Sequence, residues 1–244
     1  MEAHHPHHVT HKKRWTEYLL EFFMLFLAVF LGFVAENQRE HMIEHNREKK
    51  YMQSMIEDLR SDTTHLSFIS NNFKSIKLAL DTMDDEFSRL NKGFSSPVYR
   101  NLPLLLGYED LIPNDRTLQQ LKNAGGMRLI RNQDISDSIM NYDKQMKELQ
   151  IEQSSIWDLV LRFRNLGELV DIGLWKGDDN INIIQHSLEN KTILLTHDRV
   201  LWSKYRLWVM LYKQVTKNYL SELGNTKEYA IRLIAFIGKE YDVK

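Results

Sequence analysis

The chain has 244 residues, of which 43% are apolar, and a formal net charge of -1. That length can bury one sizeable core, and the balanced charge argues against a dedicated nucleic-acid binder, which would carry a basic face. The absence of cysteine excludes disulfides, thiolate metal sites and cysteine nucleophiles.

Residues 1–14 form a basic leader rich in histidine. Its histidines are His4, His5, His7, His8 and His11. Neutral imidazole is the commonest transition-metal ligand in proteins, so this leader is one candidate metal site. A disordered tail without a metal is the simpler interpretation.

Residues 15–35 form an apolar stretch long enough to cross a bilayer as a helix. Residues 22–35 contain no charged side chain, and about twenty helical residues span the ~30 Å hydrocarbon core. The predicted membrane anchor includes Trp15, Tyr18, Glu21, Phe22, Phe26, Phe30 and Gly32. A buried core helix and a removable signal peptide are the alternatives, although Phe33 stands where a signal peptidase site wants a small residue.

Glu21 interrupts this stretch about one turn inside it. A lone carboxylate in lipid is costly unless it is paired, protonated or extended to the interface. The first interpretation is an extended side chain reaching towards the basic leader. The second is a packing or proton-linked role inside an oligomer.

Basic residues flank the predicted span on both sides, and their distribution predicts its orientation. Lys12, Lys13 and Arg14 precede it closely, whereas Arg39 alone follows closely. The positive-inside rule then favours a single-pass protein with its N-terminus on the cytoplasmic side and its C-terminal domain on the far side of the membrane.

Residues 36–92 continue as a long helix, because no proline or glycine occurs between Val34 and Asn91. Apolar residues recur along it at steps of three and four, which is the heptad spacing of a coiled coil. The predicted assembly seam consists of Leu59, Leu66, Ile69, Phe73, Ile76, Leu80, Met83 and Phe87. This seam predicts a homo-oligomer, and the alternative is that it packs against later helices of the same chain.

The same heptad register, extended upstream, begins with polar residues: His41, His45, Glu48 and Asp62. His41 and His45 share a helix face at spacing i, i+4 and are a candidate metal site between subunits, or a group that titrates near neutral pH. A solvated stalk is the simpler alternative.

The remaining residues, 93–244, predict a bundle of helices. Residues 95–113 indicate a loop, 115–122 a short helix with Asp115 as its N-cap, and the Ala124-Gly125-Gly126 sequence a turn. Longer helices are predicted over 134–170, over a stretch ended by Gly224, and over 226–241. Long antiparallel helices with apolar stripes bury them against each other, so an all-α bundle completed by residues 36–92 is expected.

Candidate chemistry in this region is weak. Thr196-His197-Asp198-Arg199 resembles an acid–base pair only superficially, because adjacent residues on a helix point apart and Thr196 also suits an N-cap. The Asp178-Asp179 pair lacks the spacing of a calcium loop. The aromatic residues Trp202, Tyr205, Trp208 and Tyr212 favour bundle packing over a ligand site. We therefore predict neither an enzyme nor a cofactor.

Two sequence blocks resemble a family of uncharacterised small bacterial membrane proteins, found mainly in the Bacteroides and Flavobacterium group. The first block comprises Tyr18-Leu19, Glu21, Gly32, Glu36-Asn37-Gln38-Arg39-Glu40, Arg47-Glu48, Tyr51 and Glu57-Asp58-Leu59. The second comprises Thr117-Leu118, Leu121-Lys122-Asn123-Ala124-Gly125-Gly126-Met127-Arg128-Leu129-Ile130-Arg131-Asn132, Ile139 and Tyr142. The resemblance covers about 60% of the chain and implies a membrane anchor and a helical domain, with no known activity. For a bacterial protein of this kind, the predicted orientation places the anchor in the inner membrane and the C-terminal domain in the periplasm.

These features favour a membrane-anchored interaction protein that self-associates through its long helix, with a second membrane protein as a possible partner. The alternative is a sensor whose bundle encloses a pocket for a small ligand.

Overall fold

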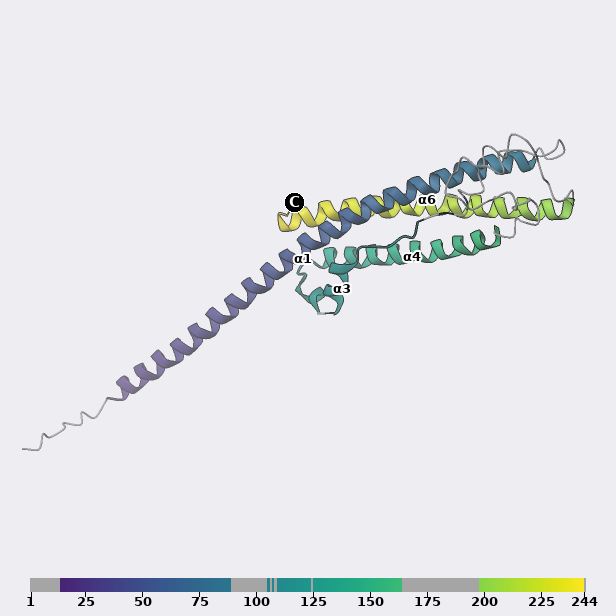
Figure 1. Cartoon of the computed structure of the whole chain (residues 1–244). Helices are drawn as coiled ribbons and strands as arrows, with labels where there is room; N and C mark the ends of the chain where they lie inside the picture. Colours follow the sequence, from purple (N-terminus) through teal and green to yellow (C-terminus); the bar gives the residue numbers. More distant parts are fainter. Residues whose placement is uncertain are drawn as a thin grey trace, which may run out of the picture. The chain divides into compact units, whose positions relative to one another are not determined.

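The structure is a computed structural model that describes residues 14–88, 105, 107, 109–123, 125–163 and 198–243, except for the side chains of 86–88, 162, 163 and 202. Its helices are α1 (Trp15–Ser88), α3 (Arg116–Asn123), the 3-10 helix η2 (Gly126–Leu129), α4 (Gln133–Phe163) and α6 (Arg199–Tyr241) (Figure 1). No strand occurs among these residues. The predicted all-α fold, with a long apolar N-terminal helix followed by further helices, is confirmed.

The chain divides into two units, Met1–Lys50 and Tyr51–Lys244. The described part of the first unit is the beginning of α1, and every residue from 14 to 47 is exposed. Phe22, Phe26 and Phe30 stack along one side, with ring centroids 6.5 and 6.2 Å apart. By length and composition this helix suits a membrane span, and none of its most apolar window is buried.

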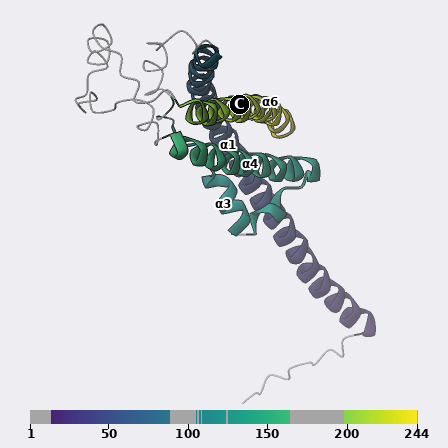
Figure 2. The same ribbon diagram turned by 90° about the vertical axis from the view of Figure 1, so that its right-hand side faces the viewer.

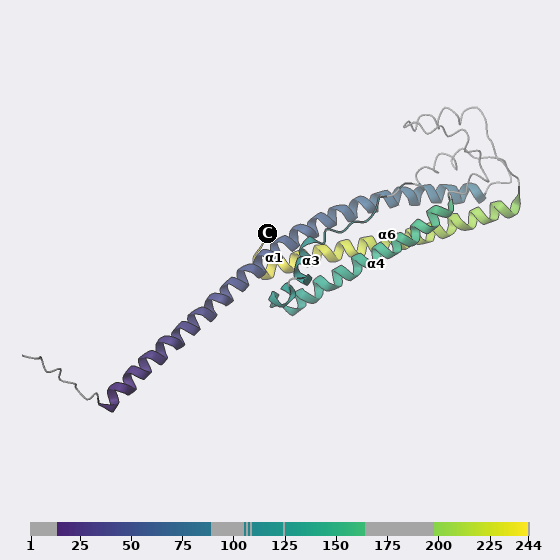
Figure 3. The same cartoon turned by 60° about the horizontal axis from the view of Figure 1, so that its bottom comes forward.

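The second unit is a three-helix bundle made by residues 51–88 of α1 together with α4 and α6, which lie side by side in three views (Figures 1, 2 and 3). Each helix buries residues at alternating steps of three and four, as in a coiled coil. Buried seam positions are Met52, Met55, Leu59, Asp62, Leu66, Ile69, Phe73, Ile76, Leu80 and Met83 on α1; Ile135, Ile139, Tyr142, Met146, Leu149, Gln153, Ile156 and Val160 on α4; and Tyr205, Val209, Tyr212, Thr216, Tyr219, Leu223, Thr226, Ala230, Leu233 and Ile237 on α6.

Helix α6 runs antiparallel to α1, because Tyr219 meets Phe73 at 4.7 Å between ring centroids and the earlier Lys213 meets the later Asp84 at 3.3 Å. Helices α1 and α4 instead run in the same direction (Figure 1). The expectation of antiparallel neighbours is therefore right for α6 and wrong for this pair. The connection between the end of α1 at Ser88 and the start of α4 at Gln133 is long. The chain can therefore return to the start of the bundle before α4 begins, which a parallel pair requires.

Side chains cap the starts of α4 and α6. The Asn132 side chain accepts hydrogen bonds from the N–H groups of Asp134 and Ile135 at the start of α4. Asp198 accepts from the N–H of Val200 and caps α6, while Thr196, the residue considered for this role, lies outside the described residues. These bonds satisfy amide donors that a helix leaves unpaired at its first turn.

Gly224 lies inside α6, so the predicted helix end at this residue is wrong. The buried seam continues through Leu223, Thr226 and Ala230 on either side of it. Packing along this seam outweighs the ~1 kcal/mol by which one glycine disfavours a helix. By contrast, the predicted turn at Gly125 is present, with Gly125 at φ 66° in the left-handed region that favours glycine.

Other predicted boundaries end at the limit of the description. Helix α4 is described from Gln133 to Phe163, so the end predicted at residue 170 lies outside the described residues, as does the end predicted at residue 92 for the long first helix.

Candidate functional site

Buried polar residues interrupt the bundle seam at two levels, and those around Asp62, near the start of the seam, form a polar layer. Asp62 of α1 and Gln153 of α4 occupy seam positions and are buried. The carboxylate of Asp62 accepts a hydrogen bond from the backbone N–H of Asn114 at 2.7 Å and one from the hydroxyl of Tyr142 at 2.8 Å. A buried carboxylate is tolerated here because both of its oxygens are engaged.

The same layer fixes the chain segment that leads into α3, which we call the strap (residues 109–117). Asp58 of α1 accepts from the N–H of Thr117 at 2.9 Å and from the Arg116 guanidinium at 3.2 Å. Asp115 occupies the predicted N-cap position of α3, because its carbonyl accepts from the N–H of Gln119. The side-chain acceptor for the N–H of Thr117 comes from Asp58 of α1 instead.

Gln153 secures the other end of the strap. Its side-chain oxygen accepts from the N–H of Leu111 at 2.8 Å, and its amide donates to the carbonyl of Glu109 at 2.9 Å. The backbone groups of the strap are therefore paired by buried side chains in place of a neighbouring strand or helix.

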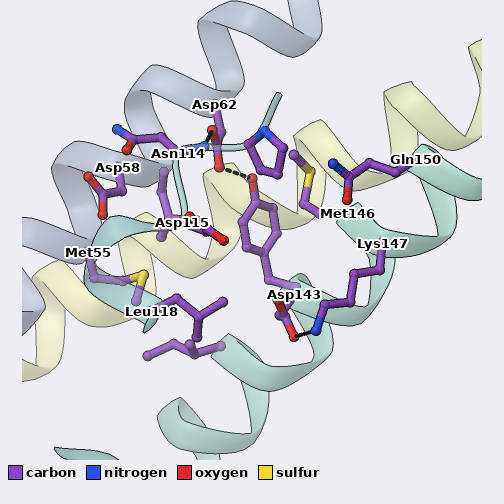
Figure 4. A pocket seen from close by; sticks show the side chains of 14 residues that line it. Met55, Asp58, Asp62, Asn114, Asp115, Leu118, Asp143, Met146, Lys147 and Gln150 are labelled. Carbon is purple, nitrogen blue, oxygen red and sulfur yellow. Dashed lines mark hydrogen bonds and ion pairs between the residues drawn. The ribbon is translucent and has the colours of Figure 1, made fainter. Parts of the chain in front are cut away.

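A cavity of about 50 Å³ lies in this layer, between α1, α3 and α4 (Figure 4). It is lined by Met55, Asp58, Leu59, Asp62, Pro113, Asn114, Asp115, Leu118, Ile139, Tyr142, Asp143, Met146, Lys147 and Gln150. A water molecule needs roughly 10–15 Å³ of such space, whereas small-molecule sites occupy roughly 300–1,000 Å³. The cavity suits a few water molecules and is too small for a metabolite.

Burial governs the ionisation of this layer. It raises the pKa of Asp62, and the two hydrogen bonds to this carboxylate and the charge of His65 offset the rise only in part. Burial, together with the neighbouring Asp62 charge, also raises the pKa of Tyr142. Both residues favour their neutral forms more than they would in water.

At the rim of the layer, Asp143 behaves in the opposite way. Burial opposes its ionisation, but the ammonium groups of Lys122 and Lys147, at 2.7 and 2.8 Å, together lower its pKa. This ion pair ties α3 to α4. The polar groups around Asp58 and Asp62 therefore hold the strap in place.

The predicted assembly seam lies inside this bundle. Leu59, Leu66, Ile69, Phe73, Ile76, Leu80 and Met83 are each at most 2% exposed in the single chain, and the side chain of Phe87 lies outside the described residues. Residues of α4 and α6 from the same chain already cover these side chains. The seam is therefore not a surface on which a second copy of the folded chain could dock.

The polar residues at the start of the predicted heptad register, His41, His45, Glu48 and Asp62, lie in different surroundings. Asp62 is part of the bundle layer, whereas His41 and His45 are exposed, with side chains 58% and 55% accessible. His41 lies 4.0 Å from Glu44, and His45 lies 3.5 Å from the buried Glu48. Within the described residues, no group of three or more potential ligands is assembled around a metal position. The His-rich leader lies outside the description.

The other predicted residues are placed as follows. All anchor residues, from Trp15 and Tyr18 through Glu21 to Gly32, are exposed on α1. Tyr205 and Tyr212 are fully buried in the bundle seam, which confirms packing as their role. Trp208 packs edge-on against Tyr205 at 5.0 Å. Asp178, Asp179 and His197 lie outside the described residues.

Sequence reasoning missed the strap and its clamps. Asp58, Asn114 and Gln153 are far apart in sequence, and only the polar interruption of two heptad seams pointed to this layer. Comparison with protein-family models, curated proteins and solved structures gives no match. The family resemblance therefore stays a prediction.

Proposed function

We propose that this chain is a single-pass membrane protein whose water-exposed helical bundle is an interaction domain. One observation carries the proposal: the large apolar side chains from Trp15 to Val34 are all exposed on one helix, each between 41% and 80%. A soluble monomer rarely exposes an apolar patch larger than a few hundred Å². A bilayer removes this surface from water without any partner protein.

The bundle supports a binding role better than a chemical one. Its polar groups near the cavity are used to hold the strap, and the cavity of about 50 Å³ does not favour the ligand-sensor alternative. The positive-inside rule supports a cytoplasmic N-terminus, because Lys12, Lys13 and Arg14 immediately precede the span. The family resemblance supports a bacterial inner membrane.

Membrane extraction of the full-length protein tests the proposal. The protein should remain with membranes after washing at alkaline pH. Replacing Leu25 and Val29 with arginine should reduce this fraction, because each arginine costs about 2.5–3.5 kcal/mol at the centre of a span. The matched control, Met42→Arg with Ile43→Arg, alters two exposed apolar residues beyond the apolar stretch and should have no effect.

The intact mass of the purified protein separates an anchor from a cleaved signal peptide. An anchor predicts the mass of all 244 residues. A protein shortened by the apolar segment, or one recovered in the soluble fraction, overturns the proposal.

A further inference from the structure

The first half of α6 presents an unusual outward surface, which we call the basic α6 face. The side opposite its buried seam exposes Val200, Leu207, Met210 and Leu211 to between 45% and 77%. Three cations border this apolar row: Arg199, Lys204 and Lys217. A surface helix normally turns charged or polar residues outward and apolar residues inward, so this arrangement indicates a binding surface.

The charge of this surface is one-sided. Residues 199–220 contain five lysines and arginines and no aspartate or glutamate. Two of these cations face α1, where Arg206 lies 3.8 Å from Asp84 and Lys213 lies 2.8 Å from Asp81. Within the described part of the chain, the other three have no carboxylate partner, and Lys204 lies over the Trp208 ring at 4.9 Å. The face therefore suits an acidic partner with apolar side chains of its own.

The second half of α4 has these properties, and we call it the acidic α4 face. Residues 148–161 contain Glu148, Glu152 and Asp158 and no lysine or arginine. Ile151 is 67% exposed and Leu161 is 37% exposed among them. The helical rise gives about 16 Å from Val200 to Leu211 and about 15 Å from Glu148 to Asp158, so the two faces match in length.

Among the described residues, the carboxylates of the acidic α4 face have little compensation by positive charge. Burial and the charges of Glu222 and Glu148 raise the pKa of Glu152. Lys144 meets Glu148 only at 3.7 Å, in an exposed pair that contributes little. A cation brought by another molecule would relieve this crowding of carboxylates.

We propose that the basic α6 face of one chain docks on the acidic α4 face of a second copy. The charges are opposite, and both faces expose apolar side chains. Because α4 and α6 contact each other in the bundle, one partner can reach both faces, and the pairing can be repeated in the reverse direction about a two-fold axis to close a dimer. The proposal rests on the proposed interaction role. The contact between copies is then made by exposed side chains of α4 and α6, and not by the predicted assembly seam of α1, which is buried.

The mass of the full-length protein in mild detergent, measured by light scattering at low salt, tests this contact. The wild type should have twice the mass of one chain. Lys204→Glu with Lys217→Glu should weaken dimerisation at least tenfold, and so should Glu148→Lys with Asp158→Lys. Combining the four substitutions exchanges the charges and should restore the dimer, which a folding defect would not do.

The matched control is Glu57→Lys with Lys74→Glu, two exposed positions on α1 outside both faces, and it should leave the mass unchanged. A monomeric wild type overturns the inference, as does a dimer that either reversal leaves intact, or a fourfold variant that stays monomeric. If the membrane span or residues 164–197 hold the dimer together, the charge reversals will leave it intact. Membrane extraction of the same samples reports separately on the proposed anchor.

Discussion

At the scale of single residues, Asp62 shows how a side chain unsuited to a seam position comes to occupy it. Its seam neighbours Leu59 and Leu66 are apolar, and all three are buried. Asp62 binds the strap through Asn114 and α4 through Tyr142. The sequence shows the polar interruption, but not its partners, because they lie 52 and 80 positions away in a loop and a later helix.

Asp62→Ala should lower the stability of the bundle by roughly 1–3 kcal/mol, because it leaves the buried Tyr142 hydroxyl unpaired. The Asn114 N–H, which is only part-buried, adds less. Asp62→Asn keeps an acceptor oxygen and removes a buried charge, so its thermal midpoint at pH 7 should equal or exceed that of the wild type. Circular dichroism during heating checks both. Equal destabilisation by alanine and asparagine would contradict the hydrogen-bonding role.

The pH dependence of stability in the wild type and in Asp62→Asn tests the ionisation of Asp62. Because the folded pKa of Asp62 is raised, the folded state holds this proton at pH values where the unfolded state has lost it. Its contribution to stability is greatest below the unfolded pKa of about 3.9 and is lost as pH rises through the folded pKa. The stability advantage of Asp62→Asn over wild type should therefore be largest near pH 7 and shrink towards pH 4. An advantage that grows on acidification would show that Asp62 is stabilised as a charge.

At the scale of secondary-structure elements, the sequence predicted which parts are helical because the spacing of three and four is local information. The same spacing cannot tell whether a stripe packs against its own chain or another copy. For α1 the outcome depends on α4 and α6, which bury Ile69 and Phe73 completely. The spacing also could not predict that α1 and α4 run in the same direction, because their direction depends on where the strap is held.

Ile69→Asp should unfold the bundle and not merely separate subunits. It places a charge where Ile69 is fully buried, at a cost well above the ~4 kcal/mol that marks severe core damage. Leu78→Asp on the same helix is the matched control, because Leu78 is 69% exposed and surface changes usually stay within about 0.5 kcal/mol. Helical content and resistance to limited proteolysis distinguish them. A soluble, fully helical monomer of Ile69→Asp would restore the seam as an assembly surface.

Gly224→Ala should stabilise α6 by about 0.5–1 kcal/mol. A methyl group at Gly224 would meet no atom within 4 Å, and alanine loses less backbone freedom on folding than glycine. Thermal unfolding should shift upward. Gly126→Ala is a useful contrast, because its methyl group would lie 3.1 Å from a Leu121 side-chain carbon and 3.2 Å from the Leu121 Cα and should yield no such gain. Destabilisation by Gly224→Ala would indicate a required bend or contact at this position.

At the scale of the whole molecule, the chain combines two surfaces with opposite requirements. Residues 14–47 are exposed along a helix that is mostly apolar up to Ala35, whereas the bundle unit hides its apolar seams and, apart from buried carboxylates such as Asp58 and Asp62, carries its charges outward. A bilayer satisfies the first requirement and water the second. Orientation across the membrane then decides which compartment supplies a partner for the bundle.

Orientation can be read by labelling single cysteines, since the natural chain contains none. Ser221→Cys introduces a thiol on the exposed side of α6, and Thr10→Cys introduces one before the predicted span. With a cytoplasmic N-terminus, a maleimide that cannot cross the inner membrane should label Ser221→Cys in cells with a permeabilised outer membrane and Thr10→Cys only after lysis. Deleting residues 12–14 should weaken this preference by removing the three cations before the span. The reverse labelling pattern would place the bundle in the cytoplasm.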